Sequence, residues 1–337
     1  MKRIIALWIA LCVLLSGCNI AMPPPDIEAT VQTAVQQTVA APTPRAILAT
    51  PTFEDNLRTL QEKLSSLCWV AYSPTHFDPD KGLYPSETDI REDLRILYNA
   101  RFRGLVTYGA TSPSQQIPRL AKEAGFEGVI MGVWSPTSAE EIANAKGATA
   151  YVDGYSVGNE GLFFGRYDFN TLKATMDDVR TATQRPVATT EVLSSYFGDA
   201  NLRELGDWVF PTAHPYWNGV KTPQPAVTWT QQQFVALSGL YTATYKLVVF
   251  KEVGLPTAGD PLVSEAGQAD YYRLLRGTSV KFVCFEAFDQ PWKTSQPVEP
   301  YWGLFKSDRS PKSVVNYICA QSFLYLPLTL GQSLAGS

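Results

Sequence analysis

Eight short apolar runs, each followed by a helix-like pattern, constrain the fold of this chain more than any other feature. A strand and a helix repeated eight times over roughly 260 residues match a (β/α)8 barrel, for which about 250 residues are typical. A doubly wound open sheet is the alternative, but it normally has fewer strands and often a glycine-rich phosphate-binding turn. We therefore predict a single α/β domain folded as a (β/α)8 barrel. The runs cover residues 68–73, 104–108, 128–134, 150–157, 186–190, 208–213, 246–251 and 280–285.

Helix start signals separate these runs. Ser86 stands three residues before Asp89, a spacing typical of a capping box. Ser138 precedes two glutamates in the same way, and Pro311 suits the first position of a final helix over residues 310–322. We therefore predict helices between the strands of the barrel.

Composition excludes several classes of function. The 337 residues carry a net charge of -4 and no run rich in Lys or Arg, so we expect no nucleic-acid partner. The 2 histidines, His76 and His214, have no companion at metal-ligand spacing, and no glycine-rich phosphate-binding motif is present. We expect neither a metal nor a cofactor.

The first residues are typical of an export signal. Lys2 and Arg3 precede an apolar run over residues 4–15, which is shorter than the ~20 residues that span a bilayer. The run ends at Cys18 in a sequence that resembles a bacterial lipoprotein box. We expect a signal peptide over 1–17, lipid on Cys18, a flexible Pro/Thr/Ala-rich linker over 18–55 and the folded domain over 56–337. The protein would then be anchored to the outer side of the cell membrane; an ordinary secretory signal, with Cys18 a free thiol, is the alternative.

Three further cysteines fall in the folded part, namely Cys68, Cys284 and Cys319. Two arrangements stay open: three small buried thiols, or a disulfide between Cys68 and Cys319 with Cys284 free.

Carboxylates follow three of the predicted strands. Glu160 ends the fourth run, Glu252 follows the seventh, and Glu286 follows the eighth. In a barrel these strand ends meet at one rim, where active sites lie. Two facing carboxyl groups can divide the roles of acid and nucleophile in cleaving a glycosidic bond, and ionised Glu252 would raise the pKa of Glu160. Asn159 could bind a sugar hydroxyl and Trp292 could stack on a pyranose ring.

The residues around these acids resemble the family 17 glycoside hydrolases over about residues 68 to 315. The Gly-Asn-Glu sequence at 158–160 matches the family's acid/base motif, and the segment 252–259 matches its nucleophile motif except at Val253 and Leu255. The segment 285–293 differs from the bacterial branch only at Gln290, and 299–305 resembles the motif that follows it.

This resemblance implies a retaining enzyme that acts on β-1,3-glucan, with Glu160 as acid/base and Glu252 as nucleophile. It also implies a polar network of Glu286, Lys293 and Glu299 around the bound sugar. Further substrate-binding residues that it implies are Asn159 and Trp292, Tyr216 near the nucleophile, Trp217 along the cleft, and Tyr72 and Tyr108 on its floor. In a retaining enzyme the two catalytic carboxyl groups should stand ~5–5.5 Å apart.

Other functions stay open. The same site could transfer the sugar to a second sugar as a transglycosylase. A non-catalytic glucan-binding surface lipoprotein is a different class, although it would not need both Glu160 and Glu252. A Schiff-base lyase is disfavoured because Lys251 adjoins Glu252 in one strand, so that alternation should turn it to the opposite face. We expect a monomer.

Overall fold

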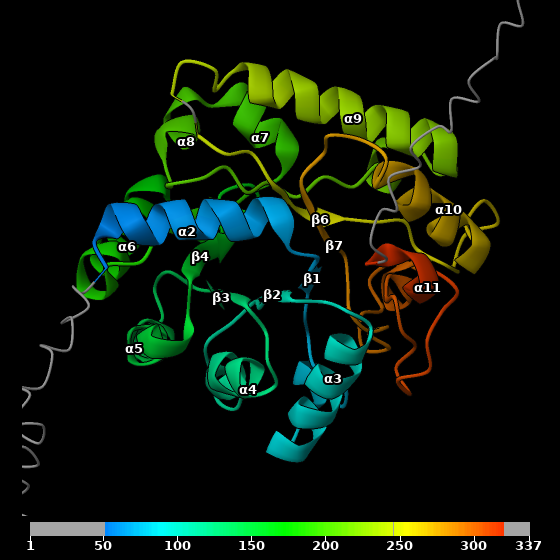
Figure 1. The fold of residues 1–337 in the computed structure, drawn as a ribbon, viewed down its shortest axis with the longest axis horizontal. Helices are drawn as coiled ribbons and strands as arrows, with labels where there is room; N and C mark the ends of the chain where they lie inside the picture. Colours follow the sequence, from blue (N-terminus) through cyan, green and yellow to red (C-terminus); the bar gives the residue numbers. More distant parts are fainter. Residues whose placement is uncertain (1–50, 245, 320–337) are drawn as a thin grey trace, which may run out of the picture. The chain divides into compact units, whose positions relative to one another are not determined.

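Seven parallel strands form a curved sheet in the order β5-β4-β3-β2-β1-β7-β6 in the computed structural model (Figure 1). The model describes residues 51–244 and 246–319, so the predicted signal peptide, Cys18 and nearly all of the linker lie outside the described residues. The strands are β1 Trp69–Ala71, β2 Gly104–Val106, β3 Gly128–Val133, β4 Gly154–Asn159, β5 Val187–Thr190, β6 Phe250–Val253 and β7 Phe282–Cys284.

Residues 208–213 close this sheet into a ring. Val209 pairs with Val248 beside β6, and Thr212 pairs in parallel with both Val192 and Glu252. Pro211 has no N–H to donate, so this segment joins its neighbours by separate bridges instead of a continuous ladder. All eight predicted runs therefore contribute to one parallel ring, which confirms the barrel.

Helices surround the ring (Figure 1). Ser86 caps α3 in the predicted capping box with Asp89, and Ser138 caps α5; such a cap stabilises a helix by about 1 kcal/mol. The helices after β1 are α3 Glu87–Asn99, α4 Ile117–Glu123, α5 Ala139–Gly147, α6 Phe169–Thr183, α7 Leu193–Gly198, α8 Ala200–Glu204, α9 Pro223–Gly239, α10 Glu265–Leu275 and α11 Val315–Ile318. Short 3-10 turns cover Pro79–Lys81, Ser114–Gln116, Thr149–Tyr151, Tyr216–Asn218 and Glu299–Tyr301.

The last helix is shorter than the sequence indicated. Pro311 pairs with Phe305 in an antiparallel bridge and does not begin a helix. The next residue, Lys312, is buried and donates to Asp289 and Thr257, each at 2.7 Å. These contacts hold the chain extended past Pro311, so helix α11 starts only at Val315.

Helix α2, Phe53–Ser66, covers the end of the barrel where the strands begin. Leu60 packs near Gly154, the first residue of β4, and Lys63 bonds Asp153 at 2.6 Å. Beneath the helix, the indole of Trp69 fills the space in which a Cβ on Gly104 would stand, and its N–H donates to the carbonyl of Lys63. This end is closed by packing, which leaves the opposite end for a site.

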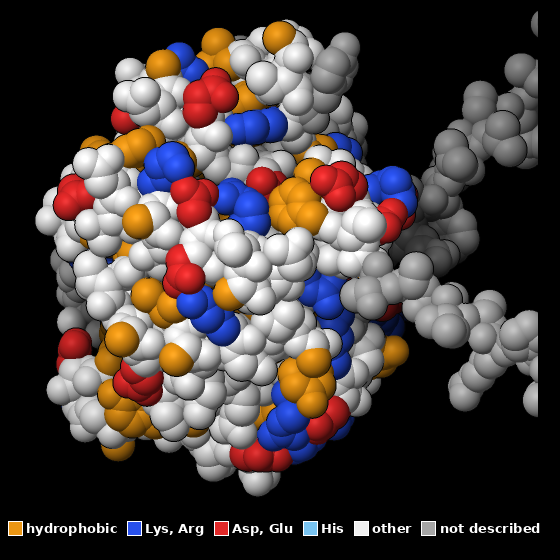
Figure 2. All heavy atoms as spheres, turned by 90° about the vertical axis from the view of Figure 1, so that its left-hand side faces the viewer, with side chains coloured by type: hydrophobic (Ala, Val, Ile, Leu, Met, Phe, Trp, Pro, Cys, Tyr) orange, Lys and Arg blue, Asp and Glu red, His pale blue; other side chains and the backbone are white. Residues whose placement is uncertain are grey.

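A disulfide joins Cys68 to Cys319, whereas Cys284 is a buried free thiol. Of the two arrangements left open by the sequence, the structure has the disulfide. Within residues 51–319 apart from 245, no helix is long and apolar enough to cross a membrane, and no cluster of His, Cys, Asp and Glu is arranged to hold a metal ion. On the face in Figure 2, acidic and basic side chains lie side by side.

Candidate active site

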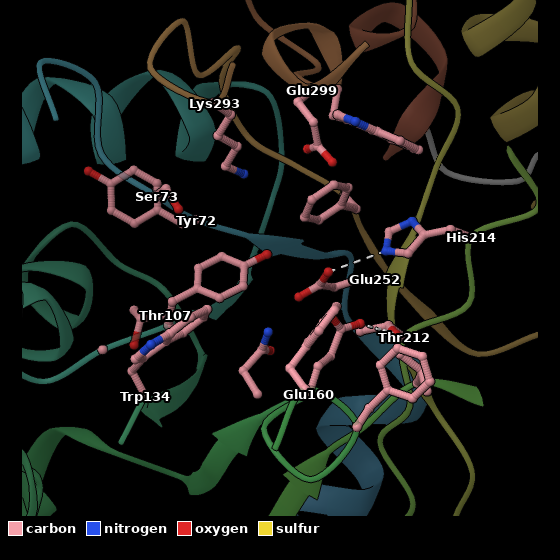
Figure 3. Close-up of a pocket in the computed structure, with 18 of the residues that line it drawn as sticks. Tyr72, Ser73, Thr107, Trp134, Glu160, Thr212, His214, Glu252, Lys293 and Glu299 are labelled. Carbon is pink, nitrogen blue, oxygen red and sulfur yellow. Dashed lines mark hydrogen bonds and ion pairs between the residues drawn. The ribbon is translucent and has the colours of Figure 1, made fainter. Parts of the chain in front are cut away.

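A cavity of about 1180 Å³ lies at the carboxyl ends of the strands. In Figure 3 the carboxyl groups of Glu160 and Glu252 point into this space, and Lys293 and Glu299 also reach it. Most of the residues predicted for the site line it: Tyr72, Tyr108, Asn159, Glu160, Trp217, Glu252, Trp292, Lys293 and Glu299. Glu286 and Tyr216 do not, and their positions are described below.

Glu160 follows β4 in a tight turn. Its backbone has a φ of 56°, and Gly158, two residues earlier, has a φ of 78°. A side chain at Gly158 would collide with the hydroxyl of Tyr167, so only glycine fits there. The Glu160 carboxyl accepts a hydrogen bond of 2.6 Å from Thr212 Oγ1. Burial, and then the negative charge of Glu252, raise the pKa of Glu160, so this group keeps its proton to a higher pH than an ordinary glutamate.

Glu252 lies in β6 and is buried. Its Oε2 is 3.3 Å from His214 Nε2, and its Oε1 is 3.3 Å from the ammonium of Lys251 but accepts no hydrogen bond from the described residues. Burial alone would raise the pKa of Glu252, but Lys251 and His214 outweigh it and lower the pKa to about 2. Glu252 is therefore an ionised carboxylate held between Lys251 and His214.

The two acids thus have pKa values pushed in opposite directions within one cavity. The raised pKa lets Glu160 donate a proton, and the lowered pKa keeps Glu252 ionised, so the two groups suit the roles of acid and nucleophile. Thr212 links them, since its side chain bonds Glu160 and its backbone pairs with Glu252. The retaining separation of ~5–5.5 Å stays a prediction.

His214, and not Tyr216, contacts Glu252. The Tyr216 hydroxyl donates to Asp260 at 2.9 Å. Tyr216 does not line the cavity, whereas Trp217 of the same 3-10 turn, Tyr216–Asn218, does. The His214 ring packs against Phe285 and Trp302, with ring centroids 5.0 and 5.2 Å away. His214 and Thr212 were not among the residues predicted for the site; their position at the end of the sixth run was the signal that could have found them.

Lys251 also differs from its predicted position. Its ammonium donates to Asn159 Oδ1 and lies 4.4 Å from the centre of the Tyr108 ring. The register between β6 and β7 shifts between Phe250 and Val253, and such an irregularity breaks the alternation of side chains. Lys251 consequently shares the interior with Glu252, although it lies beneath the cavity and does not line it.

Glu286 is wholly buried behind the cavity. Lys293 Nζ donates to both of its oxygens, at 2.7 and 2.9 Å. Burial raises the pKa of Glu286 to about 7, against the opposing effect of Lys293. Lys293 and Glu299 line the cavity themselves, whereas Glu286 does not.

The structure shows what surrounds the three residues that depart from the family motifs, Val253, Leu255 and Gln290. Val253 and Leu255 are buried in the core and do not line the cavity. Gln290 donates to the Ser73 carbonyl at 3.1 Å and accepts from Trp292 Nε1 at 2.8 Å. A glutamate could not donate to that carbonyl, so the amide suits this position.

Aromatic rings stand on two opposite sides of the cavity. In one group, which follows β1 and β7, the half-buried Phe77 ring lies 5.9 Å from exposed Tyr84 and 5.7 Å from half-buried Trp292. The other is the pair Phe163 and Phe164, 5.1 Å apart, in the turn after β4. In the ring of eight segments β4 and β7 stand opposite each other. A chain of sugars that stacks on both groups would cross the cavity above the two acids.

The chain is similar in sequence to fungal proteins. The chain is 26% identical over 259 residues to "Cell surface mannoprotein MP65" of Candida albicans, and 26% identical over 279 residues to "Probable glucan endo-1,3-beta-glucosidase btgC" of Aspergillus fumigatus. These alignments cover 71% and 68% of this chain, but 66% and 39% of the relatives. The chain thus spans less than two thirds of either relative's length.

A solved structure shares the fold. The crystal structure of an endo-laminarinase from Formosa Hel1_33_131 superposes with a TM-score of 0.64 at 17% identity, over 77% of this chain and 87% of that one. The model of the BtgE/BtgC glycoside hydrolase domain matches residues 70–303. This match confirms the resemblance to the family 17 glycoside hydrolases, and the chain belongs to the BtgE/BtgC glycoside hydrolase domain family.

Proposed function

We propose that this protein is a retaining glycoside hydrolase that cleaves β-1,3-glucan. The observation that carries the proposal is the pair of carboxyl groups in one cavity, with the pKa of Glu160 raised and that of Glu252 lowered to about 2. The linkage is inferred from the Aspergillus relative, named a probable glucan endo-1,3-beta-glucosidase, and from the Formosa protein, named an endo-laminarinase. The opposed aromatic groups suit a chain that extends on both sides of the cleaved bond.

The reaction needs two displacements. The ionised carboxylate of Glu252 attacks the anomeric carbon while Glu160 gives its proton to the departing glycosidic oxygen, so the glycosyl–oxygen bond breaks and a glycosyl ester of Glu252 forms. Glu160, now ionised, removes a proton from water, whose oxygen attacks the same carbon and releases Glu252. Since Lys251 occupies the Asn159 oxygen, the Asn159 amide NH2 is left to donate to a sugar hydroxyl.

Activity assays test this function. Wild type and Glu252→Gln are incubated with laminarin, a β-1,4-glucan and a mixed-linkage glucan. We expect oligosaccharides from laminarin with the wild type only. A wild type that binds laminarin without cleaving it would instead support the glucan-binding lipoprotein, and cleavage by Glu252→Gln would exclude Glu252 as the nucleophile.

Transglycosylation is the second candidate. Phe163 and Phe164 stand in the turn that carries Glu160, on the side where the leaving sugar departs, and their side chains are 57% and 63% exposed. An acceptor sugar stacked there would compete with water for the glycosyl-enzyme. Incubation with concentrated laminari-oligosaccharides should then yield products longer than the substrate, whereas products that are all shorter would exclude transfer.

We propose further that the protein acts as a monomer held on the cell membrane by lipid on Cys18. The lipoprotein-like sequence that ends at Cys18 supports this anchoring. Expression in a bacterial host with labelled fatty acid should label the wild type but not Cys18→Ser, which should leave the membrane fraction. Light scattering of the detergent-solubilised protein would test the monomer.

A further inference from the structure

Glu191 is a fully buried carboxylate that the mechanism above does not use. It follows β5, and its side chain faces the turn after Glu160. Oε1 accepts a hydrogen bond of 3.0 Å from the N–H of Leu162, and Oε2 accepts one of 3.2 Å from the N–H of Phe163. No Lys, Arg or His in the described part of the chain forms an ion pair with Glu191. Burial of such a group is costly unless hydrogen bonds compensate, so these contacts are its main support.

Tyr167 connects Glu191 to Gly161, the residue before Leu162. Its hydroxyl donates to Glu191 Oε1 at 3.3 Å and accepts from the N–H of Gly161 at 3.0 Å. A Cβ on Gly161 would overlap the Tyr167 ring, so the turn packs tightly against it. Three successive backbone N–H groups after Glu160 are therefore tied to Glu191, directly or through Tyr167.

The turn needs such support because of its conformation. Glu160 has a left-handed φ of 56°, which is unfavourable for a residue with a side chain. Its own N–H donates to the Thr190 carbonyl at 2.7 Å, one residue before Glu191. Arg166 also supports the turn, because its guanidinium donates to the Asn159 carbonyl and stacks on Trp134, with its Cζ 4.4 Å from the ring centre. Glu191 supplies the side-chain acceptors that hold the middle of the turn.

We propose that Glu191 is a positioning residue for the acid/base of this enzyme. By accepting hydrogen bonds from the N–H groups of Leu162 and Phe163, it fixes the turn. The Glu160 carboxyl then keeps its hydrogen bond from Thr212 and its position beside Glu252. The inference rests on the proposed function, because it concerns the proton that Glu160 gives to the leaving oxygen in that reaction.

Substrates with different leaving groups test this role. Laminarin needs its leaving oxygen protonated, whereas a 2,4-dinitrophenyl β-laminaribioside releases a phenolate that needs no proton. For Glu191→Ala we expect laminarin hydrolysis to fall about 100-fold, the usual size of a general-acid effect. The first-turnover release of dinitrophenolate should stay close to that of the wild type. Azide should accelerate later turnovers, since it attacks the anomeric carbon without a base, displaces Glu252 and forms a β-glycosyl azide.

Two further variants separate positioning from folding. Glu191→Gln keeps one acceptor oxygen, so we expect its laminarin activity to lie between wild type and Glu191→Ala. Asp153 offers a control at the opposite end of the barrel, because its carboxylate also accepts from a backbone N–H, that of Val129 at 2.8 Å, and does not line the cavity. For Asp153→Asn the ratio of the two activities should equal the wild-type ratio.

The outcomes are distinct. If both activities fall in proportion in the two Glu191 variants, and azide has no effect, Glu191 serves stability alone and the inference is overturned while the proposed function stands. If the wild type cleaves neither substrate, the proposed function itself fails and the inference fails with it. Loss of laminarin activity with retained dinitrophenolate release and azide acceleration supports the inference.

Discussion

Thr212 Oγ1 donates to Glu160 Oε1 over 2.6 Å, and the backbone of the same residue pairs with Glu252. The next N–H, that of Ala213, donates to the Glu252 carbonyl at 2.9 Å. One residue of the segment that closes the barrel therefore contacts both acids. The irregular strand around Pro211 consequently has a direct part in the geometry of the site.

Removal of the Thr212 hydroxyl should change the pH dependence of activity. The hydrogen bond from Thr212 lowers the pKa of Glu160, so Thr212→Val raises it. Because Glu160 must be protonated for the first displacement, the basic limb of kcat/KM should move to higher pH. Loss of this hydrogen bond to a carboxyl group should also lower the activity at the optimum about tenfold. Thr212→Ser should restore both properties; an unshifted basic limb in Thr212→Val would contradict the assignment of Glu160 as the acid.

Lys251 should control the acidic limb. Its charge is the largest of the effects that lower the pKa of Glu252, against the opposing effect of burial. Lys251→Met has nearly the same volume but no charge, so the pKa of Glu252 rises from about 2 and the acidic limb of kcat/KM moves to higher pH. The basic limb should move less, because Lys251 has a smaller effect on Glu160. A pH–rate profile with the acidic limb unchanged would show that Lys251 does not act on the nucleophile.

The disulfide should contribute strongly to stability. It links residues separated by 251 positions, and cross-linking so long a segment is expected to add roughly 5 kcal/mol to the free energy of unfolding. Denaturant titration of the Cys68→Ser, Cys319→Ser double variant measures this difference. Cys284→Ala provides the control, since it keeps the disulfide and should respond to a reductant as the wild type does. Equal stability of double variant and wild type would rule out this role.

Gly104→Ala should destabilise the barrel floor. The added methyl group would overlap the Trp69 indole, and overpacking of this kind costs about 1–3 kcal/mol. Gly147→Ala is the matched control, because nothing lies within 4 Å of a Cβ at the end of α5. Urea midpoints should fall for the first variant and stay equal or rise for the second; equal midpoints for both would contradict the packing described for Trp69.

The sequence was sufficient to predict the ring of eight segments and the positions of Glu160 and Glu252, because strand periodicity and strand ends are local signals. It failed at Lys251, since a shift of register between β6 and β7 depends on the pairing of distant residues. The family resemblance, and not a local pattern, implied Tyr216 near the nucleophile; its hydroxyl instead donates to Asp260, 44 positions further along the chain. Glu191 carried no signal of its own, as its partners lie some thirty positions earlier in the chain.

The most direct test of the account is the identity of the residue that carries the glycosyl group. A 2-deoxy-2-fluoro-β-laminaribioside with a dinitrophenyl leaving group should accumulate a covalent intermediate, because the fluorine slows both displacements and the leaving group accelerates the first. Mass spectrometry of the peptides from the trapped enzyme should find one added glycosyl unit, on Glu252. An adduct on any other residue, or α-anomeric product from laminari-oligosaccharides with no adduct, would contradict a retaining mechanism through Glu252.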